Sequence, residues 1–292
     1  MVGDALRNSM AQKHFNVLQL VRRNPEAPNQ LQWNPASSPA IAHVEALEGL
    51  NAAIHLSGAN LAAHRWTPDY KRELTSSRID STRALATALA GLRNPPKMLL
   101  MASAVGIYGN RGDELLDETS APGKGFLADL CQQWEAAAQP AVEAGIRVLY
   151  LRFGMILTAG PGALARLLPI FRMGLGGRLG DGRQFMSWIA LDDLLAAIFY
   201  LLESPTASGP FNFTAPNPIT NAQFTRALAG HLHRPAFFAV PKPALRLAFG
   251  EMADEALLAS VRAYPAKLAA TGFQFSCPSI VHALPAILPR NR

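Results

Sequence analysis

Two adjacent arginines, Arg22 and Arg23, follow a short apolar segment, residues 15–20 (FNVLQL). Arg22 stands 19 positions after Gly3, and residues 4–13 have the spacing of a helix. In a dinucleotide-binding fold, a glycine at the start of the first helix lets the backbone approach the pyrophosphate, and a residue about 20 positions later contacts the ribose. An arginine at that later position favours the 2′-phosphate of NADP. The alternative interpretation is a solvated turn that carries two ordinary arginines.

Strands and helices alternate along the first half of the chain, as a doubly wound parallel sheet requires. Residues 97–102 (KMLLMA) form a continuous apolar run, typical of a strand buried on both faces. Thr67 and Pro68 suit the N-cap and the first position of a long helix. Residues 24–39, with four prolines, are predicted to form a loop. The predicted elements are strands at 15–20, 52–56, 97–102 and 148–153, and helices at 4–13, 68–92, 126–144 and 192–202.

The composition of the sequence changes after Gly154. Glycine becomes frequent there, and a region rich in proline and alanine at helical spacing follows. We predict that residues 1–155, with 186–214 returning to them, form the dinucleotide-binding domain. Residues 156–185 and 215–292 are predicted to form a smaller, mostly helical C-terminal lobe. Ligands of such folds lie at the carboxyl ends of the strands, where a second lobe can close over them.

The amino-acid composition limits the classes of partner that we expect the protein to bind. Hydrophobic residues make up 49% and charged residues 16% of the chain, which carries a net charge of +6. No apolar run approaches the roughly 18 residues that span a bilayer, and no signal peptide is visible, so we expect a cytoplasmic protein without a membrane partner. Lysine and arginine are scattered, which favours a small phosphate-bearing ligand over nucleic acid. The two cysteines lack metal-ligand spacing, so no metal is expected. The substrate and the oligomeric state stay open.

A series of short motifs resembles the "epimerase family" branch of the atypical, extended short-chain dehydrogenase/reductases. The resemblance covers nearly the whole chain and includes that branch's C-terminal domain of unknown function, at Arg234-Pro235, Val240-Pro241 and Gly250-Glu251-Met252. It implies NAD(P) binding and leaves the substrate unassigned. The other matching motifs are His55-Leu56-Ser57-Gly58, Arg65-Trp66-Thr67, Ser77-Arg78, Ala102-Ser103-Ala104, Tyr108-Gly109, Trp134-Glu135, Leu151-Arg152-Phe153-Gly154, Gly180-Asp181-Gly182-Arg183-Gln184 and Asp192-Asp193.

The resemblance aligns Met1-Val2-Gly3 with the end of the family's glycine motif, so the first strand and the earlier glycines are expected to be absent. Residues 15–20 would then pair directly with 52–56, or the N-terminal segment would be poorly ordered. Ser57-Gly58 is expected to pass close to the cofactor, and a tight turn that needs glycine is the alternative. Ala59 stands where relatives carry glutamate. The remaining residues assigned to the cofactor site, which is expected to hold NADP with NAD possible, are Leu56, Arg78, Ala102, Gly154 and Met155.

Typical relatives use a serine or threonine together with a Tyr-x-x-x-Lys pair on a helix, where the lysine lowers the tyrosine's pKa. The resemblance places Ser103 at the serine position but puts Leu127 and Cys131 at the tyrosine and lysine positions. Tyr108 is then the nearest substitute proton carrier, and packing against a loop is an equally good interpretation of it. We predict an NADP-binding oxidoreductase or sugar-nucleotide-type epimerase with a non-standard active site. The alternative is a non-catalytic NADP-binding sensor or scaffold.

Overall fold

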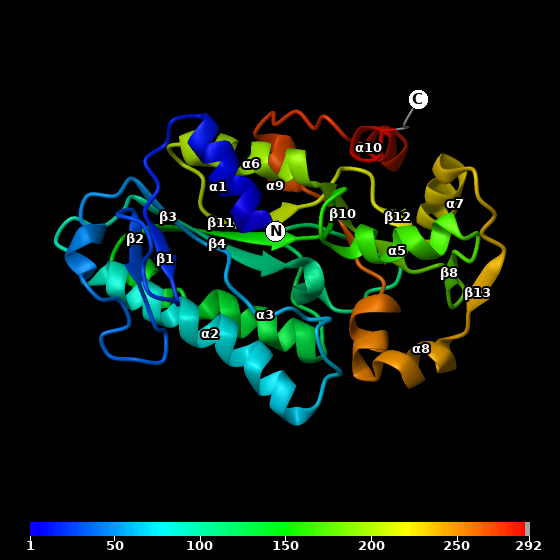
Figure 1. Ribbon diagram of the computed structural model, residues 1–292, viewed down its shortest axis with the longest axis horizontal. Helices are drawn as coiled ribbons and strands as arrows, with labels where there is room; N and C mark the ends of the chain where they lie inside the picture. Colours follow the sequence, from blue (N-terminus) through cyan, green and yellow to red (C-terminus); the bar gives the residue numbers. More distant parts are fainter. Residues whose placement is uncertain (290–292) are drawn as a thin grey trace.

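A computed structural model describes residues 1–289, which are built around a four-stranded parallel sheet (Figure 1). The α/β class and the Rossmann-like parallel sheet are confirmed. In spatial order the strands are β11 (Gly209–Phe213), β6 (Arg147–Phe153), β4 (Met98–Ala104) and β3 (Ala52–His55).

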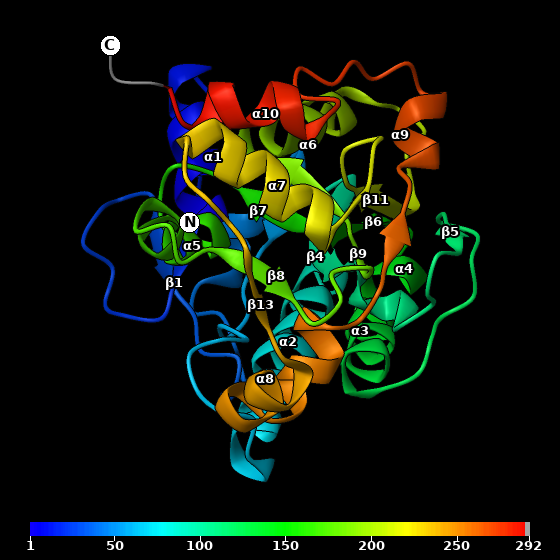
Figure 2. The same ribbon diagram turned by 90° about the vertical axis from the view of Figure 1, so that its right-hand side faces the viewer.

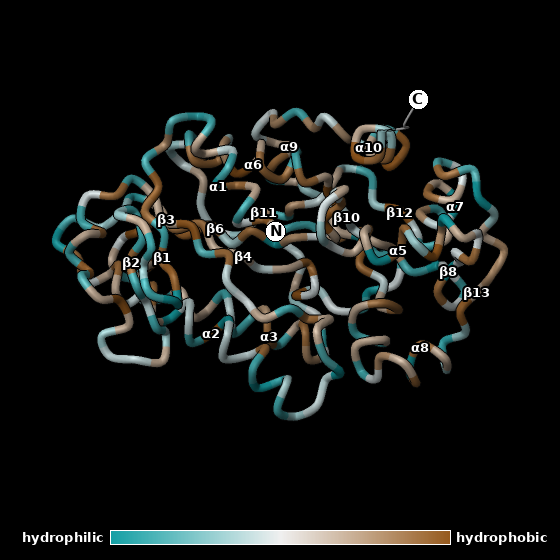
Figure 3. The backbone as a smooth tube through the Cα atoms, in the orientation of Figure 1, coloured by the Kyte–Doolittle hydropathy of each residue, from teal (hydrophilic) through white to brown (hydrophobic). Residues whose placement is uncertain are grey.

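Alternate side chains of β4 enter the two cores that cover the sheet. Met98 and Leu100 pack with side chains of α1 (Val2–Gln12) and α6 (Leu191–Glu203). Leu99 and Met101 pack with those of α2 (Pro68–Ala90) and α4 (Gln139–Glu143). Successive side chains of a strand point to opposite faces, so a continuous apolar run suits a sheet covered on both sides. Figure 1 shows these two helical layers, and Figure 3 shows hydrophobic segments where the central strands lie between them.

The helix predicted over residues 126–144 is divided into α3 (Phe126–Ala136) and α4. Pro140 lies in the first turn of α4 and has no backbone N–H, so it cannot continue the hydrogen-bond ladder from α3. By contrast, α2 begins as predicted, because the Thr67 hydroxyl accepts a hydrogen bond from the backbone N–H of Tyr70 at 3.2 Å.

The first strand pair differs from expectation. β1 (Gln19–Val21) pairs in parallel with β2 (Gln30–Gln32), a strand inside the segment predicted to be a loop. The prediction of direct pairing between residues 15–20 and 52–56 is wrong, because β1 and β3 lie in separate sheets. Within residues 1–289, no strand is hydrogen-bonded between them. The chain before β1 forms helix α1, whose Leu6 and Met10 are buried against the sheet.

We use the name second lobe for the elements around a further hydrophobic core, which includes Trp188 and Phe224. This grouping takes in residues 186–190, which the predicted division assigned to the dinucleotide-binding domain. Its outer edge is a pair of parallel strands, β8 and β13, which Figure 2 brings to the front together with α8. The elements of this lobe are β7 (Met155–Leu157), α5 (Ala163–Arg172), β8 (Gly177–Leu179), β9 (Phe185–Met186), β10 (Trp188–Ala190), β12 (Ile219–Thr220), α7 (Asn221–Leu232), β13 (Phe238–Val240), α8 (Lys242–Phe249), the π-helix η3 (Ala253–Leu257) and α10 (Ile280–Ile287).

Part of the C-terminal region, residues 262–270, lies beside the four-stranded sheet. β14 (Arg262–Ala263) pairs with β5 (Leu115–Leu116), and α9 (Ala266–Ala270) packs on β11. Two short 3-10 helices, η1 (Val44–Leu47) and η2 (Val105–Tyr108), complete the described chain. None of the helices within residues 1–289 is long and apolar enough to cross a membrane.

Candidate cofactor cleft and buried polar network

A cleft of about 920 Å³ opens at the carboxyl ends of β1, β2 and β3. It brings together Arg22, which follows β1, and Leu56, Ser57 and Gly58, which follow β3, as the sequence analysis predicted. The loop after β2, residues 33–36, forms another wall that was not predicted. The carboxyl ends of parallel strands are the usual place for a ligand in this fold class.

One wall of the cleft is a polar stripe on α2 that the sequence analysis also missed. Its members recur at intervals of three and four residues, and such side chains lie on one face of a helix. That spacing, beside the predicted Ser57-Gly58 turn, is the signal that would have identified the stripe. The α2 residues lining the cleft are Glu73, Ser76, Ser77, Asp80 and Ser81.

Arg78 supports the Ser57–Ala59 turn from behind. Its guanidinium donates to the carbonyl oxygens of Ala59 at 2.9 Å and Leu74 at 3.0 Å, and its Cζ lies 3.2 Å from where a Cβ on Gly58 would stand. Burial lowers the pKa of Arg78. The backbone N–H of Ala59 also donates to the Ser77 hydroxyl at 3.1 Å. The geometry therefore makes Arg78 a residue that shapes the turn, and its contact with the cofactor stays a prediction.

The two predicted arginines have different surroundings. Arg22 lines the cleft, whereas Arg23 forms an exposed ion pair with Glu26. Beside Arg22 lies His55, whose Nε2 is 3.2 Å from the Ser81 hydroxyl. Burial, reinforced by the charge of Arg22, lowers the pKa of His55 to about 4, so this imidazole is neutral near pH 7. Arg22 is therefore the arginine placed to meet an anionic ligand group.

Four further predicted cofactor residues are outside the set that lines this cleft. Gly3 is in the first turn of α1, and Ala102 is buried within β4. A Cβ on Gly154 would lie 2.7 Å from the carbonyl oxygen of Ser187, so close backbone packing requires glycine there. Met155 pairs with Trp188 where β7 meets β10. Packing accounts for Ala102, Gly154 and Met155 without a ligand.

Ser103 and Tyr108 belong to one buried polar network. The Ser103 hydroxyl donates to Glu135 Oε1 at 2.7 Å, and Arg152 forms two hydrogen bonds with the Glu135 carboxylate at 2.8 and 2.9 Å. Arg152 Nη1 also donates to the Tyr108 hydroxyl at 3.0 Å. Burial opposes the charge of Arg152, but the hydrogen bonds and charge of Glu135 outweigh it and raise the pKa of Arg152. The network holds β4, α3 and β6 together.

The network continues from Tyr108 into the C-terminal region. The Tyr108 hydroxyl donates to Asn212 Oδ1 at 2.8 Å, and the backbone N–H of Asn212 donates to Glu118 at 2.9 Å. The other Glu118 oxygen accepts from the backbone N–H of Lys267 at 3.2 Å. Tyr108 is fully buried, and burial raises its pKa. A tyrosine in this state is held as a neutral phenol rather than tuned to release a proton near pH 7.

The positions that carry tyrosine and lysine in typical relatives are both buried. Leu127 packs with Trp66 and Tyr70 in a hydrophobic cluster. Cys131 is buried beside Tyr108, and burial, together with the charge of Glu135, raises the pKa of its thiol to about 12. A thiol in such surroundings stays protonated and unreactive. No group of three or more His, Cys, Asp or Glu side chains suited to a metal occurs among residues 1–289.

A second, smaller cavity of about 420 Å³ includes residues of the family motif at 180–184. Asp181, Arg183 and Gln184 line it from the second lobe, and Gly112 and Asp113 line it from the first. Ser103 and Tyr108 are outside its lining. The cavity also includes Lys242, Leu258 and Ser260.

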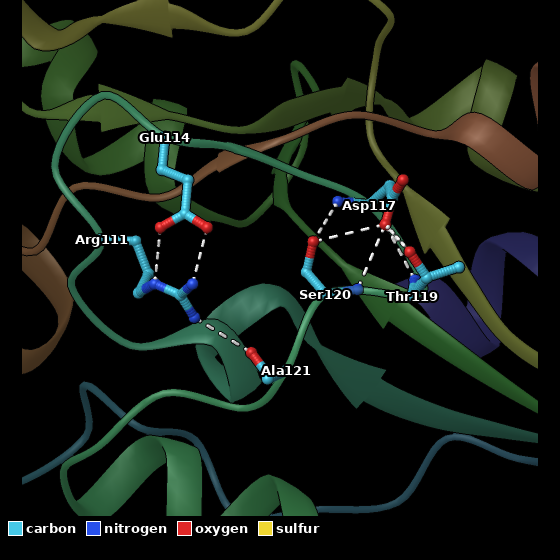
Figure 4. A network of polar contacts seen from close by, with 6 residues as sticks. All are labelled: Arg111, Glu114, Asp117, Thr119, Ser120 and Ala121. Carbon is cyan, nitrogen blue, oxygen red and sulfur yellow. Dashed lines mark hydrogen bonds and ion pairs between the residues drawn. The ribbon is translucent and has the colours of Figure 1, made fainter.

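The loop that carries Gly112 and Asp113 is fixed by its own hydrogen bonds (Figure 4). Arg111 forms two hydrogen bonds with the Glu114 carboxylate, at 2.6 and 2.8 Å, and donates to the carbonyl of Ala121 at 3.1 Å. Asp117 accepts hydrogen bonds from the hydroxyl and backbone of Thr119, which lower its pKa. This cavity therefore has one wall that is preorganised.

Residues 1–213 match the NAD dependent epimerase/dehydratase family, and residues 240–287 match a domain of unknown function, DUF1731. The chain belongs to the NAD dependent epimerase/dehydratase family, as the motifs predicted. It is 43% identical over 284 residues to epimerase family protein Mb2239 of Mycobacterium bovis, covering 97% of this chain and 93% of that protein. It is 36% identical over 291 residues to epimerase family protein MW0731 of Staphylococcus aureus, covering 97% and 94%.

Among solved structures, the chain is similar to human epimerase family protein SDR39U1, which was crystallised with NADPH. The TM-score is 0.90 and the sequence identity is 31%, with 100% of this chain and 97% of the human chain covered.

Proposed function

We propose that this protein binds NADP in the 920 Å³ cleft, with Arg22 contacting the 2′-phosphate and the Ser57-Gly58 turn lying against the cofactor. The observation that carries the proposal is the placement of Arg22 in the wall of a cleft at the carboxyl ends of the strands. An arginine there distinguishes NADP from NAD by its charge. The similar human protein was crystallised with NADPH, which agrees with this assignment.

The reaction class that we assign is hydride transfer, in an oxidoreductase or a sugar-nucleotide-type epimerase with a non-standard active site. NADP supplies the hydride chemistry when bound. The chain contributes the cleft with Ser81 in its wall, the neutral His55 beside Ser81, and the turn held by Arg78. The Ser103 and Tyr108 hydroxyls are engaged by Glu135 and by Asn212, so neither is a free proton donor in this state. General acid–base assistance accelerates a reaction by about 10²–10⁴-fold. We therefore expect the turnover rate to be lower by about that factor than in relatives that carry the tyrosine–lysine pair.

A second candidate function is NADP sensing without turnover. The same buried network favours it, because the Ser103 hydroxyl donates to a carboxylate already paired with Arg152, and the Tyr108 hydroxyl donates to Asn212. Leu127 and Cys131 also offer no replacement for a tyrosine–lysine pair. Under this proposal the cleft alone performs the function, and the polar network is structural.

Binding and turnover can be measured separately. Calorimetric titration of the protein with NADPH and with NADH is expected to show that NADPH binds more tightly. Equal affinities would refute the assignment of Arg22. The absorbance of NADPH is then followed with a panel of carbonyl compounds and nucleoside-diphosphate sugars. Slow oxidation of NADPH supports the enzyme, whereas NADPH binding without turnover on any compound supports the sensor.

A further inference from the structure

The outer edge of the second lobe presents a surface without acidic, amide or hydroxyl side chains. It is built from residues 170–178, at the end of α5 and through most of β8, and from residues 234–240, which lead into and form β13. The two segments lie side by side, because Phe238 pairs with Gly177 across the strands. Both contain only arginine, apolar residues, glycine and proline. Figure 2 shows this edge, which we call the Arg/Phe surface.

Large apolar side chains of the Arg/Phe surface are exposed. Phe237 is 90% exposed, Met173 is 65% exposed, and Phe238 and Leu175 are each more than half exposed. Single exposed apolar residues are ordinary, but several together on neighbouring segments mark an interaction site. This surface is separate from the two cavities described above, because none of these four residues lines either one.

The charge of the Arg/Phe surface has one sign. Arg172, Arg178 and Arg234 are exposed, and none of them takes part in an ion pair within residues 1–289. The sequence has no aspartate or glutamate between residues 144 and 180 or between 204 and 250. A partner must therefore offer both negative charge and an apolar region.

We propose that the Arg/Phe surface binds the interface of a bilayer that contains anionic phospholipid. Arginines attract acidic headgroups, and aromatic and aliphatic side chains enter the boundary between headgroups and acyl chains. We expected no membrane partner because the sequence lacks a spanning segment, and a peripheral contact does not need one. Phe237, as the most exposed of these side chains, is assigned to insertion.

Other occupants fit less well. A second copy of the chain in a two-fold dimer would place this surface against itself, with arginine facing arginine. Proteins that recognise nucleic acid use hydrogen bonds from amide and hydroxyl side chains in addition to arginine. The two segments carry arginine but no amide or hydroxyl side chain. The aliphatic side chains of Met173 and Leu175 also cannot stack on bases. An acidic protein is the remaining alternative, and the experiment below distinguishes it.

The test is co-sedimentation of the full chain with vesicles of phosphatidylcholine, with and without phosphatidylglycerol, over a range of NaCl concentrations. We expect binding only to the vesicles with phosphatidylglycerol, weakening as salt rises. Replacing Arg172, Arg178 and Arg234 together with glutamine should lower the partition coefficient on the order of 100-fold. The double variant Phe237→Ser/Phe238→Ser should lower it at least about tenfold, because insertion no longer buries apolar area.

Matched controls are Arg93→Gln and Leu115→Ser, two exposed positions outside the second lobe, which should leave vesicle binding unchanged. An unchanged melting temperature and NADPH affinity will show that the surface variants fold. The proposal is overturned if the parent ignores phosphatidylglycerol vesicles or if the surface variants bind them as the parent does. Retention on polyglutamate without vesicle binding also overturns it, and would assign the surface to an acidic protein.

Discussion

Tyr108→Phe removes a single oxygen from the centre of the buried network. The Tyr108 hydroxyl accepts from Arg152 Nη1 at 3.0 Å and donates to Asn212 Oδ1 at 2.8 Å. Phenylalanine keeps the ring but leaves a buried guanidinium N–H and a buried amide oxygen without this partner. A hydrogen bond to a charged group contributes about 1.5–3 kcal/mol. We therefore expect the free energy of unfolding to fall by about 2–3 kcal/mol.

Tyr150→Phe is the matched control, because Tyr150 is half-buried in β6 and its hydroxyl makes no hydrogen bond within residues 1–289. Its substitution should change stability by less than about 0.5 kcal/mol. Urea unfolding followed by circular dichroism measures both variants, with the slope m compared to the parent. Equal shifts of the two midpoints would show that the network does not hold Tyr108 as described. NADPH oxidation by Tyr108→Phe at or near the parent rate would show that Tyr108 is structural rather than catalytic.

Two further predictions concern the walls of the cleft. Arg78→Met removes the hydrogen bonds to Ala59 and Leu74, so the Ser57–Ala59 turn should loosen and the Kd for NADPH should rise about tenfold or more. Calorimetry measures this, and an unchanged Kd would contradict the supporting role of Arg78. For His55 the folded pKa of about 4 lies below its unfolded value of about 6.5, so the unfolded state binds the extra proton between those values. Stability from this site is complete above pH 6.5 and falls by about 3 kcal/mol as the pH drops to 4, and His55→Gln should remove that part of the pH dependence. Urea unfolding at both pH values measures this. If His55→Gln loses as much unfolding free energy between pH 6.5 and 4 as the parent does, the pH dependence belongs to other groups.

The sequence allowed much of the sheet to be predicted, because its signals are local. The apolar run of β4 alternates between two cores, and Thr67 caps α2 as its type and position indicate. β2 was missed because Gln30-Leu31-Gln32 has one apolar residue among prolines, and its pairing with β1 gives no local pattern.

The candidate site was predicted where a single spacing defines it and missed where several elements must meet. The spacing from Gly3 identified Arg22. It could not distinguish Arg22 from Arg23, because Arg23 is drawn away only by its ion pair with Glu26, three residues later. The network around Ser103 and Tyr108 needs Glu135, Arg152 and Asn212 from three other elements. Those contacts depend on tertiary packing, so residue types alone could not distinguish a catalytic hydroxyl from a buried structural one.

The central claim is that Arg22 selects NADP, and the ratio of the Kd values for NADH and NADPH tests it most directly. That ratio is measured by calorimetry in the parent, in Arg22→Ala and in Arg23→Ala. Loss of a charged hydrogen bond to the 2′-phosphate, about 1.5–3 kcal/mol, should reduce the ratio roughly 10- to 150-fold in Arg22→Ala. Arg23→Ala removes only an exposed ion pair with Glu26 and should leave the ratio nearly unchanged. The account is contradicted if Arg22→Ala keeps the parent's preference for NADPH, or if Arg23→Ala loses it to the same extent.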